Sequence, residues 1–262
     1  MAELRNLEDG FVGFDASKNE NVFVVCPVKC FCGDNPCQSQ LSFHLGSTST
    51  FFCRRCYATK DSAEDVADRR VKGDTLRIVC ELRNLALDEN ASNQDIQNLR
   101  RQHGIKETCP VFFELKSIDM HKHTPVESLH TFLLGMVKYL TRDTFEHYIY
   151  GAQKKNIYAF IETFDFSSFG RRLLGNFVKH HKSFVGRDFK LMIQFIPIVF
   201  YFVRLRRDVL DCWVAAADVA KLLYMKETSA GHQESLKTAI SDLISVYLEL
   251  DEDYYRSQSF IT

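Results

Sequence analysis

The fold is decided by the stretch His123-Thr-Pro-Val-Glu-Ser-Leu-His-Thr-Phe-Leu-Leu-Gly-Met-Val-Lys138, where the chain turns helical. Thr124 suits a helix N-cap, Pro125 suits the first turn, and Glu127 suits the third position. Beyond this start, apolar residues keep helical spacing as far as Leu140. Similar patterns follow near residues 142–154, 156–163, 168–182, 187–203, 207–226 and 231–250. We therefore expect a helical body over residues 124–262.

Before this stretch, the sequence contains both strand patterns and helical patterns. Residues 1–35 contain short runs rich in Val and Phe, which predict strands. Helical patterns are expected over residues 37–45, 62–70, 75–87 and 93–103. The segment 105–124 is irregular and marks a boundary. The sequence thus predicts an α+β, predominantly helical protein, with a β-containing front over residues 1–50 and a Cys/His segment over 51–123.

The composition is that of a globular protein, because 45% of the residues are hydrophobic and 22 are Phe. The formal net charge is -1, so the overall charge gives no sign of a nucleic-acid partner. No apolar run is long enough to span a membrane, and the first ten residues are too polar for a secretory signal. The nine cysteines, an odd number, therefore predict free thiols and a metal site in an intracellular, reducing compartment.

The pair Cys53-Arg-Arg-Cys56 is a candidate half of a metal site. Two thiolates at this spacing can hold one tetrahedral Zn²⁺ from a tight turn. The remaining ligands could come from His121, His123, His130 or Cys109. Two other interpretations stay open: a pair of buried thiols without a metal, and a redox pair. The strand-to-helix context that a redox pair needs is missing here.

Two carboxylates are candidates for a catalytic metal site. Asp34 follows an apolar run and precedes Asn35-Pro36, so it sits at a strand end held by a turn. Asp188 opens a long apolar helix pattern. Each position also suits a purely structural role, since Asp stabilises turns and interacts well with a helix N-terminus.

The segment from Arg171 to Lys190 has Asp188 as its single acid, with phenylalanines between its basic residues. Such a stripe can meet DNA phosphates, and it can equally be a solvated helix face. Its candidate DNA-binding residues are Arg171, Arg172, Lys179, Lys182, Arg187 and Lys190, with Arg204, Arg206 and Arg207 further on.

These motifs, in this order, resemble blocks of the CACTA-type (En/Spm-like) DNA transposases, most closely the copies of mushroom-forming fungi. The first block is Gly33-Asp-Asn-Pro-Cys-Gln-Ser-Gln40, followed by His44, Gly46 and Phe52-Cys-Arg-Arg-Cys56. The second block is the stretch quoted above, and the third is Val185-Gly-Arg-Asp-Phe-Lys190 leading into Gln194 and Pro197. The resemblance covers roughly residues 10–225.

The resemblance implies a partial RNase H-like nuclease core with a zinc-binding insertion. In such enzymes three carboxylates hold two divalent metals, usually Mg²⁺, for DNA strand transfer. Asp34 matches the second carboxylate and Asp188 the third, which is usually Glu. Cys53, Cys56 and His130 match the zinc-binding residues, with His121 or His123 for the fourth ligand. Glu127 matches the acid three residues before the family's downstream His.

The first carboxylate has no good match, because Asp15 lies too close to Asp34. The resemblance thus predicts an N-terminally truncated transposase remnant, inactive alone, acting on DNA in the nucleus. It implies a homo-oligomer or a complex with a full-length transposase relative. The alternatives are a co-opted, non-catalytic zinc-containing module that binds DNA or protein, and a structural helical domain with accidental motif matches.

Overall fold

The computed structural model describes residues 2–62, 68–106, 111–170 and 177–250. The chain forms two compact units, and the division falls between Glu127 and Ser128. Helices dominate both units, and the described residues form one small sheet of two strands. This confirms the prediction of an α+β, predominantly helical chain.

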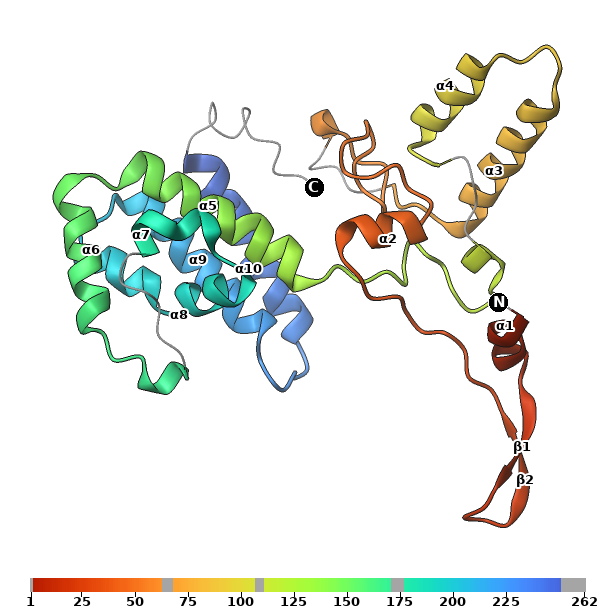
Figure 1. Ribbon diagram of the computed structural model, residues 1–262, viewed down its shortest axis with the longest axis horizontal. Coiled ribbons are helices and arrows are strands. Elements are labelled where there is room, and N and C mark those ends of the chain that lie inside the picture. Colours follow the sequence, from red (N-terminus) through yellow and green to blue (C-terminus); the bar gives the residue numbers. More distant parts are fainter. Residues whose placement is uncertain (1, 63–67, 107–110, 171–176, 251–262) are drawn as a thin grey trace. The chain divides into compact units, whose positions relative to one another are not determined.

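Unit 1, which ends at Glu127, contains the sheet and several helices (Figure 1). Its elements in chain order are α1 (Ala2–Asp9), β1 (Phe11–Asp15), β2 (Glu20–Val24), α2 (Asn35–Leu41), the 3₁₀ turn η1 (Lys60–Ser62), α3 (Lys72–Leu87), α4 (Asn93–His103) and the 3₁₀ turn η2 (Val111–Glu114). The helices α3 and α4 lie side by side.

Strands β1 and β2 form an antiparallel hairpin in which Val12 faces Phe23 and Phe14 faces Asn21. Opposed residues of such a pair share one face of the sheet. Val12 is 69% exposed, Phe14 64% and Phe23 67%. The hairpin therefore presents an apolar face to solvent, which we call the hairpin face and define as Val12, Phe14 and Phe23.

The core of unit 1 draws on distant parts of the chain. Phe43, Ile78, Ile105 and Leu115 are each at most 1% exposed and pack in one cluster. An isolated bridge also pairs His44 with Ile105. The front residues 1–50 and the following segment to residue 123 therefore share one hydrophobic core.

The first long helix of the second unit begins later than the sequence predicts. Thr124 is not its N-cap, since the hydroxyl of Thr124 donates to the carbonyl of Met120 at 2.7 Å. The carbonyl of Pro125 accepts a hydrogen bond from the side-chain amide of Gln38. Both residues thus complete unit 1, and the helix starts after Ser128.

Three other expected elements differ from the structure. Ala2–Asp9 is a helix and not a strand, because it is rich in Ala, Glu, Leu and Arg, which favour helices. In the pattern over residues 62–70, residues 63–67 lie outside the description, and residues 68–70 are not helical, since Arg69 forms an isolated bridge with Cys56. The pattern over 142–154 breaks at extended Ile149.

Unit 2 begins at Ser128 and is helical throughout its described part (Figure 1). Its elements are the π-helix η3 (Leu129–Val137), α5 (Lys138–Asp143), the π-helix η4 (Thr144–Tyr148), α6 (Gly151–Thr163), the 3₁₀ turn η5 (Ser167–Phe169), α7 (Phe177–His180), the 3₁₀ turn η6 (His181–Ser183), α8 (Gly186–Phe202), α9 (Arg207–Leu223) and α10 (His232–Leu250).

Trp213 on α9 is fully buried at the centre of unit 2. Its ring meets Phe200 of α8 edge-on at 5.3 Å. Its indole N–H donates to the hydroxyl of buried Thr144 at 2.9 Å. Helix α9 thus joins α8 to the π-helical segment through one side chain, and α10 packs along α9.

The π-helix η3 depends on a glycine. A Cβ placed on Gly135 would stand 2.9 Å from the carbonyl oxygen of His130, five residues earlier. A side chain at this position would therefore crowd the wide π-helical turn. A π-helix of nine residues is unusual, because π-helical geometry is rare and occurs mostly as single turns.

Candidate functional site

The predicted Cys pair lies in the loop between α2 and α3. Cys56 is buried and Cys53 is partly buried. The backbone N–H of Arg55 donates to the sulfur of Cys53 at 3.4 Å. Burial raises the pKa of the Cys56 thiol, so without a metal this thiol stays neutral at physiological pH.

Two buried arginines hold this loop from inside. The guanidinium of Arg70 donates to the carbonyls of Cys53 at 3.1 Å, Cys56 at 3.0 Å and His103 at 2.8 Å. It also lies 4.3 Å from the ring centre of Tyr57. Because Arg70 is only 1% exposed, these carbonyls replace part of the water that a guanidinium would otherwise bind, and Nη2 has no hydrogen-bond partner among the described residues.

The second arginine, Arg54, ties the loop to α2 and to the end of the unit. It donates to the side chains of Asn35 at 3.1 Å, Gln38, and Thr124 at 3.4 Å. Burial lowers the pKa of both Arg54 and Arg70, since it disfavours their charged forms. Among the described residues, neither guanidinium forms an ion pair with a carboxylate.

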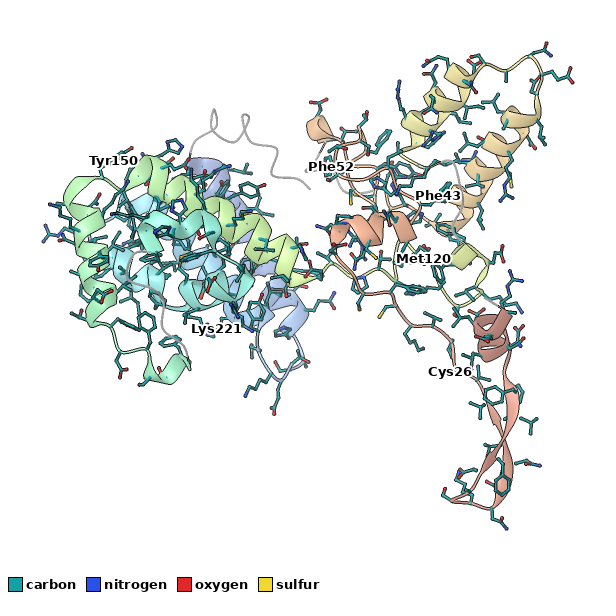
Figure 2. All side chains as sticks on the ribbon, in the orientation of Figure 1. Cys26, Phe43, Phe52, Met120, Tyr150 and Lys221 are labelled. Carbon is teal, nitrogen blue, oxygen red and sulfur yellow. The ribbon has the colours of Figure 1, made fainter. Side chains whose placement is uncertain are left out.

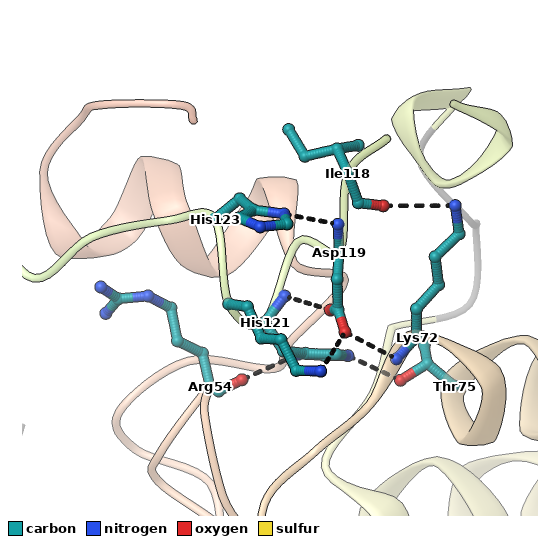
Figure 3. Close-up of polar contacts among 8 residues, drawn as sticks. Arg54, Lys72, Thr75, Ile118, Asp119, His121 and His123 are labelled. Atoms are coloured by element: carbon teal, nitrogen blue, oxygen red, sulfur yellow. Dashed lines mark hydrogen bonds and ion pairs between the residues drawn. The ribbon is translucent and has the colours of Figure 1, made fainter. Parts of the chain in front are cut away.

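The histidines that could complete a zinc site are engaged in hydrogen bonds (Figure 3). Nδ1 of His121 donates to the carbonyl of Arg54 at 2.8 Å, and Nε2 accepts from the hydroxyl of Thr75 at 2.7 Å. Nδ1 of His123 accepts from the backbone N–H of Asp119 at 2.8 Å. Burial lowers the pKa of His121, which favours the neutral ring that these two bonds require.

A third buried histidine also has a structural role. Nε2 of His44 is 2.7 Å from the carbonyl of Phe51 and donates to it, while Nδ1 accepts from the N–H of Gly46 at 3.0 Å. Burial lowers the pKa of His44 to about 3. This side chain is therefore neutral and fixes the turn that leads to the Cys pair.

The described residues do not by themselves complete a zinc site. They supply the two thiols, but no group of three His, Cys, Asp or Glu side chains that could hold a metal. His130 is exposed on η3 and belongs to the other unit. Cys109 lies outside the described residues.

The two candidate carboxylates both cap helices. Asp34 is the N-cap of α2 and accepts from the backbone N–H of Cys37 at 2.8 Å. Asp188 lies in the first turn of α8 and accepts from the backbone N–H of Val185 at 3.0 Å. Asp34 belongs to unit 1 and Asp188 to unit 2. Their positions are therefore explained by local structure.

The residues of the predicted basic stripe have different surroundings. Arg171 and Arg172 lie outside the described residues. Lys179 and Arg187 are exposed. Lys182 is also exposed, but it forms an ion pair with Glu146 at 2.6 Å. The sixth residue of the stripe, Lys190, lies in a groove.

That groove runs between α8 and α9 in unit 2. Its lining residues are Lys190, Ile193, Gln194, Ala217, Ala220, Lys221 and Tyr224. It has a volume of about 440 Å³, and the lining contains two lysines and no acid. The ammonium of Lys190 lies 3.9 Å from the ring centre of Tyr224. We call this feature the lysine groove.

The sequence predicts only part of the lysine groove. Lys190 was predicted, whereas Lys221 and Tyr224 come from the end of α9, some thirty residues on (Lys221 is labelled in Figure 2). The available signal was helical spacing, because Arg187, Lys190, Gln194 and Tyr201 fall on one exposed face of α8.

Comparisons of this chain with models of protein families, with curated proteins and with solved structures found no match. In the described part of the chain, no helix combines the length and apolar character needed to cross a membrane.

Proposed function

We propose that this chain is a transposase-derived protein that binds DNA and lacks a complete nuclease centre of its own. The observation that supports DNA binding best is the lysine groove, which combines two lysines, a glutamine and an aromatic ring without an acid. Lysines that neutralise phosphates supply most of the sequence-independent affinity for DNA. The ordered transposase-like motifs supply the family part of the proposal, including a partial RNase H-like core and a nuclear site of action.

The positions of the two candidate carboxylates, Asp34 and Asp188, indicate that the nuclease centre is incomplete. Two-metal strand transfer requires its carboxylates to converge on one pair of ions. Asp34 and Asp188 cap helices in separate units, and the described residues contain no group of three potential ligands. Neither unit by itself therefore brings together the ligands of a convergent site, and we propose that a full-length relative or a second copy supplies the missing ones.

A salt titration of binding to a labelled DNA duplex tests the binding proposal. The logarithm of the binding constant should fall linearly with the logarithm of salt concentration. Replacing Lys190 and Lys221 by Ala together should lower the magnitude of that slope by about 1.8, since each phosphate contact contributes about 0.9. The matched control replaces Lys155 and Lys237, which are exposed on α6 and α10 outside the groove, and it should leave the slope unchanged.

Two results would contradict the proposal. The first is an absence of binding to both duplex and single-stranded DNA at low salt by the folded wild-type protein. The second is Mg²⁺-dependent nicking by the purified chain that Asp34→Ala abolishes, because that would make the nuclease centre complete.

The Cys pair favours a second candidate, a non-catalytic zinc-containing binding module. The support is the placement of Cys53 and Cys56 in one loop, with the backbone N–H of Arg55 directed at the sulfur of Cys53. Metal analysis of purified protein should then find about one zinc per chain, lost in Cys53→Ser. Zinc-free protein with an unchanged fold would exclude this candidate and leave the groove as the basis for DNA binding.

A further inference from the structure

A second groove lies at the turn between α8 and α9, at the opposite end of α8 from the lysine groove. It has a volume of about 450 Å³. Its lining residues are Tyr201, Phe202, Arg204, Leu205, Arg207 and Leu210. Tyr201 is 65% exposed and Phe202 64%. Two large aromatic side chains thus stand in solvent beside two arginines, and we call this feature the aromatic groove.

The backbone of the turn places an arginine where glycine is the usual residue. The N–H of Leu205 donates to the carbonyl of Phe200 at 3.0 Å, and the N–H of Arg204 donates to that of Tyr201 at 3.1 Å. These are the two hydrogen bonds of a Schellman motif, whose left-handed position is normally Gly. Arg204 occupies that position with a φ of 55°.

This conformation is unfavourable for an arginine, so the fold alone does not explain the residue. Among non-glycine residues with positive φ, Phe43 is fully buried and fills the core of unit 1. Arg204 is exposed and contributes to no core. Strained backbone of this kind clusters at functional sites.

The charge of Arg204 is available to a ligand. Arg206 pairs with Asp208 at 2.7 Å, and Arg207 pairs with Asp211 at 3.0 Å. No carboxylate of the described residues pairs with Arg204. The groove therefore has one uncompensated guanidinium next to its aromatic rings, and the two nearby acids are already neutralised.

The aromatic side chains form a supported platform. The ring of Phe202 stacks on Phe160 of α6 at 5.7 Å and 30°. Tyr201 meets Phe202 edge-on at 5.9 Å. The amide of Gln153, also on α6, donates to the carbonyls of Val203 at 3.3 Å and Arg204 at 3.4 Å. Helix α6 thus fixes the turn and one of its rings from behind, so little ordering is needed when a flat ligand stacks on the exposed side.

The two grooves lie along one face of α8. Lys190 and Tyr201 are eleven residues apart, which is close to three full turns and about 16 Å along the axis. Gln194 and Ile198 lie between them on the same exposed face. This face is therefore cationic at its start and aromatic at its end.

We infer that the aromatic groove binds unpaired bases of single-stranded DNA, with Tyr201 and Phe202 stacking on bases and Arg204 contacting a phosphate. This inference rests on the proposed DNA-binding function and adds a strand preference to it. Bases of a duplex are stacked on one another and leave no face for a protein ring, whereas single strands bind to cationic grooves with aromatic platforms.

Fluorescence anisotropy with a labelled DNA strand of about a dozen nucleotides, and with the duplex of the same sequence, tests the inference. The wild-type chain should bind the single strand more tightly. Tyr201→Ala and Phe202→Ala should each weaken single-strand binding about tenfold, the usual loss of one stacked base, with little effect on the duplex. Lys237→Ala on α10 is the charge control.

The variant Arg204→Gly distinguishes a loss of single-strand affinity from a loss of folding stability. Glycine suits the left-handed position, so this variant should melt about 2 °C higher than the wild type while its single-strand affinity falls. Loss of affinity therefore cannot be attributed to unfolding. If the wild type binds DNA but these three variants keep full single-strand affinity, the inference is wrong and the proposed function stands. If the wild type binds neither form of DNA, both are wrong.

Discussion

Leu129, at the start of the π-helix η3, occupies the space that a side chain on Gly186 would need. A Cβ built on Gly186, the first residue of α8, would overlap the δ-methyl group Cδ1 of Leu129. Gly186 itself is buried. The π-helix η3 and α8 therefore pack closely at this point because residue 186 has no side chain.

A larger residue at this contact should destabilise unit 2. We expect Gly186→Val to cost about 1 kcal/mol, the low end of the usual range for overpacking, because the clashing methyl group ends a side chain that is 40% exposed and can move aside. Combining it with Leu129→Ala should recover part of the loss, which a double-mutant cycle of urea unfolding measures. Gly73→Val at the start of α3 is the matched control, because nothing lies within 4 Å of a Cβ there. Equal losses at Gly73 and Gly186 would show that backbone effects, and not the contact, set the cost.

The hydrogen bond from Trp213 to Thr144 should matter more than other buried threonine bonds. Thr144→Val leaves a buried indole N–H without its acceptor, so we expect a loss of about 1–3 kcal/mol. Trp213 is the only tryptophan, so its emission reports this site directly. Thr141→Val is the control, since the Thr141 hydroxyl bonds only to the carbonyl of Val137 in its own helix. A cost for Thr144→Val no greater than for Thr141→Val would contradict the prediction.

Unit 1 should lose stability as the pH falls below about 6.5. Burial lowers the pKa of His44 to about 3 and also lowers that of His121, so the folded state binds fewer protons than the unfolded state in this range. The stability is complete above the unfolded pKa and is lost progressively toward the folded pKa, by up to about 1.4 kcal/mol per pH unit for each histidine.

Urea unfolding between about pH 5 and pH 7.5, followed by circular dichroism, measures this slope. Carboxylates titrate mainly below this window, near pH 4 when unfolded. The variant His44→Gln retains a donor and an acceptor but does not titrate, so its slope should be shallower. A variant with the wild-type slope would show that His44 is not responsible.

The hairpin face should promote association. An exposed apolar strand pair is a template for pairing with another chain. Replacing Val12 and Phe14 by Lys should lower light scattering and shift size-exclusion profiles toward the monomer. Leu87→Lys is the control, because Leu87 is 82% exposed at the end of α3 but lies outside the sheet. If the control reduces association as much, general charge and not the hairpin face is the cause.

Helical periodicity predicted several of the helices. The pattern over residues 187–203 became α8, and the pattern over 93–103 became α4 with the same bounds. The capping signal at Thr124 was misread, because the sequence does not show that Arg54 and Gln38, far back in the chain, bind that segment. Local rules identify candidate caps, and tertiary partners decide which are used.

The candidate site shows the same limit. Spacing placed Cys53 and Cys56 in one loop, as the structure has them. Spacing could not show that the ring nitrogens of His121 bond to Arg54 and Thr75. Nor could it show the aromatic groove, because a φ of 55° at Arg204 has no sequence signature.

The long sequence separation between Arg54 and one of its hydrogen-bond partners has a consequence for biosynthesis. Its partners include Asn35 upstream and Thr124, which is 70 residues downstream. At about 5–20 residues per second, a ribosome needs roughly 4–14 s to make that interval. Throughout this time a guanidinium destined for the interior remains hydrated. The first unit therefore cannot complete its interior until its last segment emerges.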